Sequence, residues 1–172
     1  MEAKVALILG ELESNKDTIV ADVLKVLEDY KVPYLIKIVN GNISLKDLKQ
    51  YAQESYDNGV RVLIAGKRGA PSFSNEVAKH FNIPTIGLPM RSLNDENDIK
   101  EVFSVLQQTN EEAVANIALD GGTNAGLLAI QILGSHDATL QQRILEFKEN
   151  LKNKIVAANK EVTKIQYPNK VN

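Results

Sequence analysis

The stretch Val5-Ala6-Leu7-Ile8-Leu9-Gly10 decides the fold class of this 172-residue chain. Its apolar residues follow one another without a polar interruption, which is typical of a strand that is buried on both faces. Such strands occur in parallel sheets that helices cover on both sides. We therefore expect an α/β protein with a mainly parallel sheet.

The rest of the chain alternates between helical and strand-like patterns. We expect further strands over 34–39, 60–65, 83–89 and 113–119, and helices over 17–30, 44–58, 72–81, 95–107 and 122–134. Strict alternation with right-handed crossovers predicts a flavodoxin-like three-layer α/β/α sandwich. The length fits a single domain over 1–172, with a core over about 4–136 and a long C-terminal helix over about 138–164.

Composition and charge exclude several classes of protein. Twenty Lys and Arg against 22 Asp and Glu give a net charge of -2, which provides no basic field for nucleic acid. The absence of Cys and the presence of only two His argue against a structural zinc site, so any metal dependence would have to rest on carboxylates, and we expect no metal site. The sequence contains no apolar run long enough to span a membrane and no signal segment. We expect a cytoplasmic protein that binds neither nucleic acid nor membrane.

The C-terminal helix carries an apolar stripe. Ile144, Phe147, Leu151 and Ile155 recur at spacings of three or four among Lys, Glu and Asn residues. Periodicity shows that a stripe is buried but not what covers it. Packing on another subunit and packing on the same domain both remain open.

Ligands of parallel α/β sheets bind beyond the carboxyl ends of the strands, so the segments that follow strands carry the candidate site. Gly10 begins one of them, and its backbone suits a phosphate at a helix N-terminus. Glu11 and Glu13 oppose an anion in the same segment. The alternative is an ordinary loop in which Asp17 caps the following helix.

The segment Gly66-Lys67-Arg68-Gly69-Ala70-Pro71-Ser72 follows a central strand and precedes a helix. Arg68 suits bidentate binding of a phosphate, and Lys67 supplies a point charge. Ser72 or Ser74 could cap the helix or donate to a ligand oxygen. The alternative is a solvated loop whose two cations point outward.

Three other features favour structural roles. The segment 120–126 leads into a helix of small residues, which allows another backbone to approach closely. His136 lies beside Ser135 and Asp137, but adjacent residues cannot align as a catalytic triad. We expect structural or surface roles for His136 and His80.

Several motifs in this order resemble the PurE family. They are Val5 to Gly10, Val32-Pro33, Leu63 to Gly66 with Gly69-Ala70, Ile86-Gly87-Leu88-Pro89, and Asn124 to Leu133 with His136-Asp137. The resemblance implies a flavodoxin-like fold and interconversion of carboxylated aminoimidazole ribonucleotides in de novo purine synthesis, as a mutase or a carboxylase. It also implies a homo-octamer whose C-terminal helices reach neighbouring subunits, with no metal and no organic cofactor.

The functional motifs of the family are altered in this chain. Its Gly-Ser-x-Ser-Asp phosphate loop corresponds to a longer segment that keeps Gly10, Ser14 and Asp17. Its Ser-Ala-His-Arg-Thr-Pro motif corresponds to the segment starting at Asn40, so that Asn42 replaces a histidine and Ile43 replaces the phosphate-binding arginine. Ser72 stands at the second histidine. The expected ligand-binding residues are Gly10, Ser14, Asp17, Asn40, Asn42, Gly66, Lys67, Arg68, Gly69 and Ser72.

The replaced histidines determine the functional expectation. Histidine has an ordinary pKa near neutrality, and neither Asn nor Ser can act in its place as general acid or base. We expect a PurE-like protein that binds a phosphorylated small molecule, with Lys67 and Arg68 as new anion contacts, but has weak or absent mutase activity. The alternatives are a noncatalytic structural or regulatory subunit, and a different reaction in which Asp17 or Glu11 is the base.

Overall fold

The computed structural model describes residues 2–10, 17–39, 45–91 and 113–164. Its sheet has five parallel strands in the order β2-β1-β3-β4-β5. This is the strand order of flavodoxin-like folds, so the predicted fold class is confirmed. The strands are β1 (Val5–Gly10), β2 (Tyr34–Val39), β3 (Val62–Gly66), β4 (Thr85–Gly87) and β5 (Val114–Asn116).

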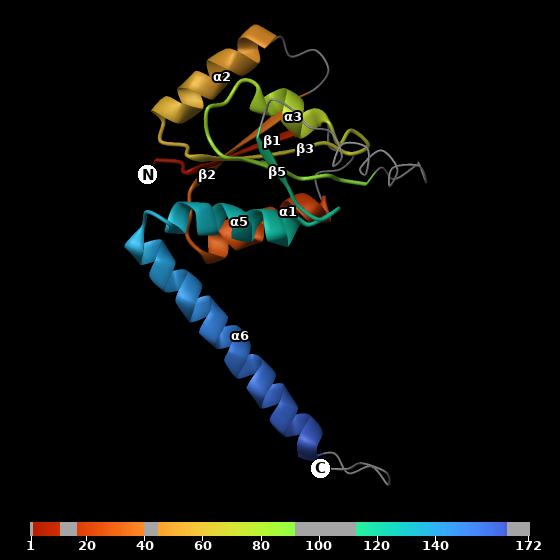
Figure 1. Ribbon diagram of the computed structural model, residues 1–172, viewed down its shortest axis with the longest axis vertical. Coiled ribbons are helices and arrows are strands. Elements are labelled where there is room, and N and C mark those ends of the chain that lie inside the picture. Colours follow the sequence, from red (N-terminus) through yellow and green to blue (C-terminus); the bar gives the residue numbers. More distant parts are fainter. Residues whose placement is uncertain (1, 11–16, 40–44, 92–112, 165–172) are drawn as a thin grey trace.

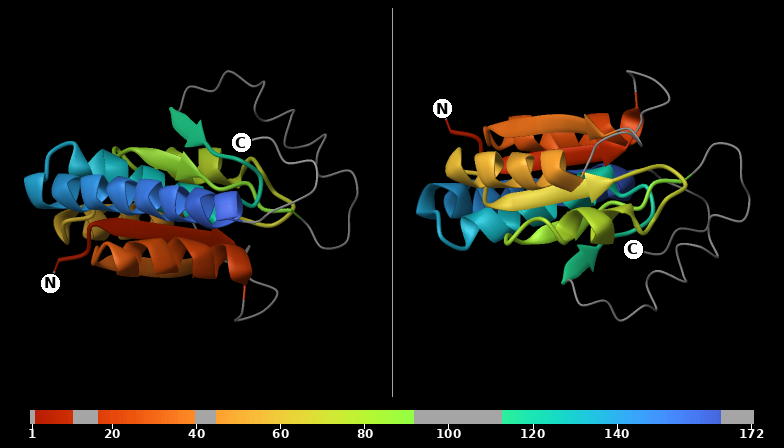
Figure 2. Two further views of the ribbon diagram at one scale, coloured as in Figure 1. Left: turned by 90° about the horizontal axis from the view of Figure 1, so that it is seen from below. Right: turned by 90° about the horizontal axis from the view of Figure 1, so that it is seen from above.

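Helices cover both faces of the sheet (Figure 1). One face packs against α1 (Thr18–Asp29) and α5 (Gly122–Gly134), which lie side by side in the view from below in Figure 2. The other face packs against α2 (Leu45–Asp57) and α3 (Phe73–Ala78). The helix predicted over 95–107 lies outside the described residues.

The buried strand β1 serves both layers at once. Its residues Val5, Leu7 and Leu9 belong to the apolar cluster formed with α1 and α5. Ala6 and Ile8 belong to the cluster formed with α2 and α3. All five are fully buried, as the uninterrupted apolar run predicts.

Small residues allow α5 to approach α1 closely. A Cβ atom on Gly122 would collide with the backbone carbonyl of Ile19, and one on Gly126 would lie 2.7 Å from Cβ of Val26. Only glycine fits at these positions without moving one helix from the other. The structural role expected for the segment 120–126 is therefore confirmed.

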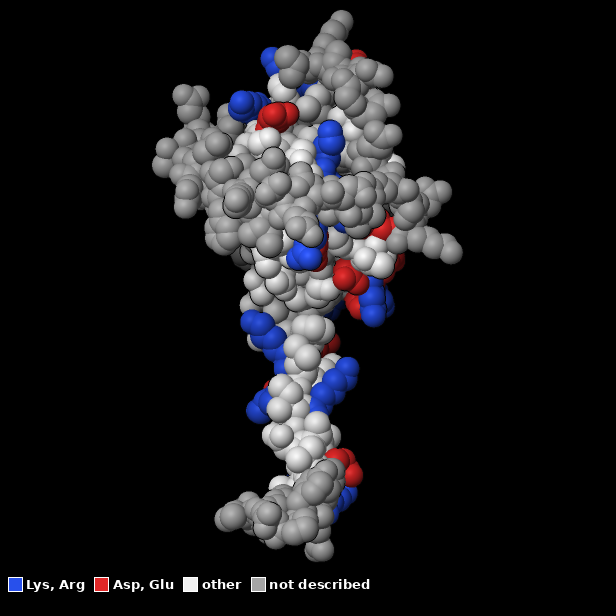
Figure 3. All heavy atoms as spheres, turned by 90° about the vertical axis from the view of Figure 1, so that its right-hand side faces the viewer, with Lys and Arg blue, Asp and Glu red and all other residues white. Residues whose placement is uncertain are grey.

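The long helix α6 (Ala138–Lys164) leaves the body of the protein (Figure 1). Near its start, Leu140 and Ile144 are buried, and Arg143 donates a hydrogen bond of 2.6 Å to the carbonyl of Tyr30. Figure 3 shows uncharged surface along the protruding part of the helix, between basic side chains. Exposed apolar residues there are Leu145, Phe147, Leu151, Ile155, Val156 and Val162. Only the first turns of the predicted stripe are buried by their own domain.

Candidate functional site

The carboxyl ends of the strands bring the candidate residues to one edge of the sheet. In register, Leu9 of β1 pairs with Gly66 of β3, so Gly10 and Lys67 are the next residues along the two neighbouring strands. Asp17 starts α1 at the same edge, and Arg68 bridges to Met90 after β4. The end of β1, the start of α1 and the segments after β3 and β4 therefore meet where the sequence places a ligand.

The carboxylate of Asp17 caps α1 and also pairs with Arg68. Its Oδ1 atom accepts hydrogen bonds from the backbone amides of Ile19 at 3.0 Å and Val20 at 3.2 Å, which caps α1. Its Oδ2 atom accepts from Nε of Arg68 at 2.9 Å and from Nη2 at 2.7 Å. The carboxylate, whose side chain is 3% exposed, is satisfied by these four bonds. The helix-cap alternative for Asp17 is confirmed.

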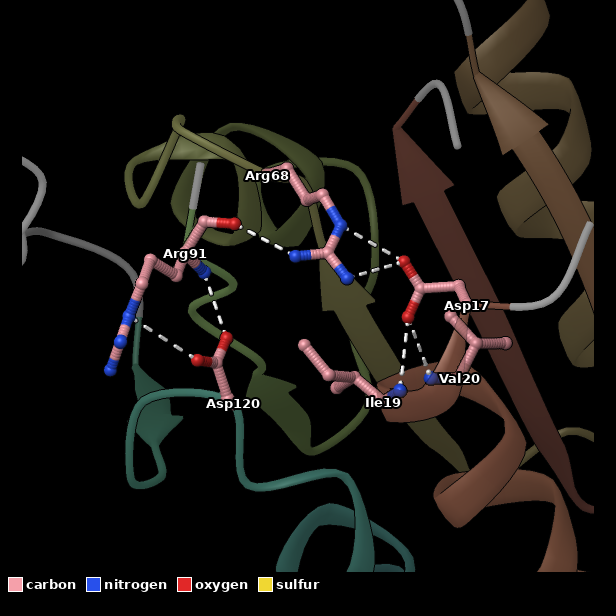
Figure 4. Close-up of polar contacts among 6 residues, drawn as sticks. All are labelled: Asp17, Ile19, Val20, Arg68, Arg91 and Asp120. Carbon is pink, nitrogen blue, oxygen red and sulfur yellow. Dashed lines mark hydrogen bonds and ion pairs between the residues drawn. The ribbon is translucent and has the colours of Figure 1, made fainter. Parts of the chain in front are cut away.

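Arg68 extends this contact across the sheet (Figure 4). Its Nη1 atom donates 2.8 Å to the carbonyl oxygen of Arg91, and the amide of Arg91 donates 2.8 Å to Oδ1 of Asp120. Nε of Arg91 also lies 3.6 Å from Oδ2 of Asp120. A chain of polar contacts thus joins the segments that follow β1, β3, β4 and β5.

This chain of contacts changes the interpretation of the predicted cations. The alternative in which both cations point into solvent is wrong for Arg68, because its guanidinium is paired with Asp17 and only 13% of its side chain is exposed. Three of its nitrogens already donate within the protein. Arg68 therefore fixes the positions of the surrounding loops.

Lys67 lies over the end of β1. A Cβ atom built on Gly10 would collide with Cγ of Lys67 and lie 2.6 Å from its Cβ and Cδ atoms. The three nearest neighbours of that position are therefore all carbons of one side chain. Gly10 is the residue type that lets the lysine stem cross the strand end. Within the described part of the chain, the Lys67 ammonium has no hydrogen bond and no ion pair.

Two more glycines shape the strand ends. A Cβ atom on Gly66 would lie 2.5 Å from the carbonyl oxygen of Leu88, so β3 and the segment after β4 are in close contact. Gly69 has a φ of 60° and donates its amide to the carbonyl of Met90 at 3.1 Å. A residue with a side chain would be strained at this φ. Both glycines support the backbone and present no side chain to a ligand.

Ser72 is exposed and occupies the N-cap position of α3, where its side chain makes no capping hydrogen bond. The capping role considered for Ser72 is therefore wrong; its backbone has helical angles, whereas side-chain capping requires an extended N-cap residue. Ser74 instead donates its hydroxyl to the carbonyl of Pro71 at 3.5 Å. The predicted site residues Ser14, Asn40 and Asn42 lie outside the described residues.

Sequence reasoning missed three polar residues at this edge. Arg91 and Asp120 complete the chain of contacts that begins at Asp17. Asn116, at the end of β5, lies over Gly87, because a Cβ atom there would collide with its side-chain oxygen. Their places at strand ends were the available signal, since residues after the carboxyl ends of parallel strands converge.

A groove of about 930 Å³ lies at the opposite edge of the sheet. Residues that precede the strands and residues of the α5–α6 junction line it, among them Lys4, Lys31 and Arg143. None of the predicted ligand residues lines this groove.

No cluster of three His, Asp or Glu residues suited to a metal ion occurs in the described part of the chain. Among the described helices, none has the length and apolarity needed to cross a membrane.

Comparison with known proteins gives consistent matches over nearly the whole chain. The family model for AIR carboxylase matches residues 4–154. The N5-carboxyaminoimidazole ribonucleotide mutase of Saccharolobus solfataricus is 32% identical over 158 residues, which cover 92% of this chain and 98% of that protein. The mutase of Pyrococcus abyssi is 31% identical over 150 residues, covering 87% and 84%.

A solved structure matches the fold. The crystal structure of Treponema denticola PurE superposes with a TM-score of 0.74 and covers 92% of this chain and 98% of that chain. The two sequences are 17% identical in this superposition, so the likeness concerns the fold. The chain therefore has relatives by sequence and a solved structure of similar fold.

Proposed function

Because the chain belongs to the AIR carboxylase (PurE) family, we propose that it binds a phosphorylated aminoimidazole ribonucleotide at the carboxyl edge of its sheet and that its mutase activity is weak or absent. The observation that carries the first half is the match of the family model to residues 4–154, together with relatives named as mutases that align along nearly their full length. The carboxyl edge is also where parallel α/β sheets bind ligands.

The second half rests on the residues that replace the family histidines. In the family, carbon dioxide passes between an exocyclic nitrogen and a ring carbon of the ligand, and a group of near-neutral pKa must move a proton at that carbon. Asn42 and Ser72 offer no such group. General acid–base catalysis is commonly worth about 10²–10⁴ in rate. A chain without it is expected to turn over slowly.

An alternative base at Asp17 has little support. Its carboxylate accepts two backbone amides and two guanidinium hydrogens, so every strong acceptor position is in use. Removing a substrate proton would require one of these bonds to break. Asp17 is therefore better suited to holding the start of α1 than to acid–base catalysis.

The exposed stripe on α6 supports a homo-oligomer, with an octamer as the family's assembly. Isolated apolar residues on a surface are ordinary, but Phe147, Leu151, Ile155 and Val162 lie on one side of the same helix and follow Ile144, which is buried. A second copy of the chain could cover this surface. The same observation favours the second candidate function, a noncatalytic subunit that assembles with itself or with an active relative.

The deciding experiment measures turnover of N5-carboxyaminoimidazole ribonucleotide by the purified protein and ligand-induced thermal shift on the same sample. A clear thermal shift with slow or undetectable turnover is the expected result. Turnover at a rate normal for the family would refute the weak-mutase part. No turnover and no thermal shift would favour the noncatalytic subunit.

A further inference from the structure

The two neighbouring cations of the loop after β3 have different roles. We propose that Lys67, whose stem lies over Gly10, binds the phosphate of the ligand in place of the family's missing arginine. Arg68 is then a positioning residue. This inference rests on the proposed function. The family's arginine would come from the segment after β2, where this chain has Ile43. Lys67 follows β3, which pairs with β1 on the side away from β2.

The path of the lysine stem supports this assignment. Gly10 follows Ala6 and Ile8 by alternation, so the position of its absent Cβ faces the layer of α2 and α3. The stem of Lys67 occupies that position. Its side chain therefore crosses the end of β1 on the α2 face, and β1 has β2 as its other neighbour. The lysine stem therefore extends from the end of β3 over the end of β1, the strand that lies between β3 and β2.

The charges at this edge support it as well. Asp17, Arg68, Arg91 and Asp120 contribute two carboxylates and two guanidiniums, and they are joined to one another. Their net charge is zero. Lys67 is partly exposed and has no partner among the described residues, so its positive charge is left for a ligand. A phosphate beside a lysine ammonium gains a charge-assisted hydrogen bond.

The first test compares three probes: aminoimidazole ribonucleotide, the corresponding riboside without phosphate, and ribose 5-phosphate. Binding is measured by calorimetry with the full chain. Lys67→Gln is expected to weaken the two phosphorylated probes roughly 10- to 100-fold, as loss of a hydrogen bond to a charged group does, and to leave the riboside unchanged. Lys25→Gln is the matched control, because it removes one exposed positive charge from α1.

The second test uses Gly10→Ala, which keeps the charge of Lys67 but places a methyl group where its stem lies. This variant is expected to weaken the phosphorylated probes as Lys67→Gln does. In a Lys67→Ala background, Gly10→Ala should cost no further affinity for them, because the displaced stem is already gone. Additive losses would contradict the contact between the two residues.

The outcomes separate this inference from the proposed function. Equal loss of riboside and ribonucleotide affinity in Lys67→Gln, or no loss of either, overturns the phosphate role of Lys67 while the binding function stands. Lysine-dependent binding of ribose 5-phosphate without binding of the ribonucleotide supports Lys67 and refutes the proposed ligand. If the wild-type protein binds none of the three probes, both the proposed function and the role of Lys67 are refuted.

Discussion

Nη2 of Arg68 lies 2.7 Å from Oδ2 of Asp17, although 51 positions separate the two residues in the chain. The contact joins the N-terminus of α1 to the loop after β3, and both side chains are largely buried. A buried ion pair costs desolvation when it forms, but removing one partner leaves an uncompensated charge. The pair therefore constrains the carboxyl edge more than a surface ion pair would.

Arg68→Gln is expected to lower the free energy of unfolding by about 3 kcal/mol, because it leaves the buried Asp17 carboxylate without its cation. Urea-induced unfolding measures this change. Arg91→Gln is the control, since Arg91 is 59% exposed in its side chain and its ion pair is 3.6 Å long. Its cost should be within about 1 kcal/mol. Equal costs for the two variants would contradict the distinction.

Gly122→Ala is expected to destabilise the protein by about 1–3 kcal/mol, because the new methyl group would collide with the carbonyl of Ile19 and force α1 and α5 apart. Thermal unfolding followed by circular dichroism provides the measurement. Thr123→Ala changes the next residue of the same helix, where the side chain is exposed. That control should leave stability nearly unchanged, and a similar loss in both variants would argue against close helix packing.

Ile155→Glu is expected to weaken self-association, because it places a charge in the exposed apolar stripe of α6. Sedimentation velocity over a range of protein concentrations measures the assembly. Asn153→Glu adds the same charge about 200° away around the helix, on its opposite side, and should leave assembly unchanged. A stripe that has no partner would give the same sedimentation profile for both variants.

Restoring the two family histidines should restore catalysis. We expect the double variant Asn42→His with Ser72→His to raise the turnover of N5-carboxyaminoimidazole ribonucleotide by about 10² or more, since histidine supplies the missing acid–base group. A double variant with Gln at both positions tests whether larger polar side chains suffice. An equal gain with Gln would show that the missing group is not an acid or base.

The layers of the fold could be predicted from the sequence because buried strands and closely packed helices require recognisable runs of apolar or small residues. The uninterrupted apolar run of β1 and the small residues of α5 each predict their own surroundings. The ends of β5 were harder to predict. The strand expected over 113–119 pairs only through Val114–Asn116, because its neighbour β4 offers just Thr85–Gly87 as partner.

The site was less predictable, for a physical reason. The sequence places Lys67 and Arg68 side by side and suggests equal roles, whereas one crosses Gly10 and the other pairs with Asp17. This division depends on the register of β1 with β3 and on where α1 begins. Neither is encoded in the seven residues of the loop itself.

The 27 residues of α6 form a rod about 40 Å long, anchored at one end by Leu140 and Ile144. Helices without tertiary packing are marginal in water, so we expect the outer turns to gain stability from the second copy of the chain proposed above. Mass action then links folding to dilution: as the protein concentration falls, helix content and melting temperature should decline together. For this chain, stability would then depend on the protein concentration as well as on the contacts within one molecule.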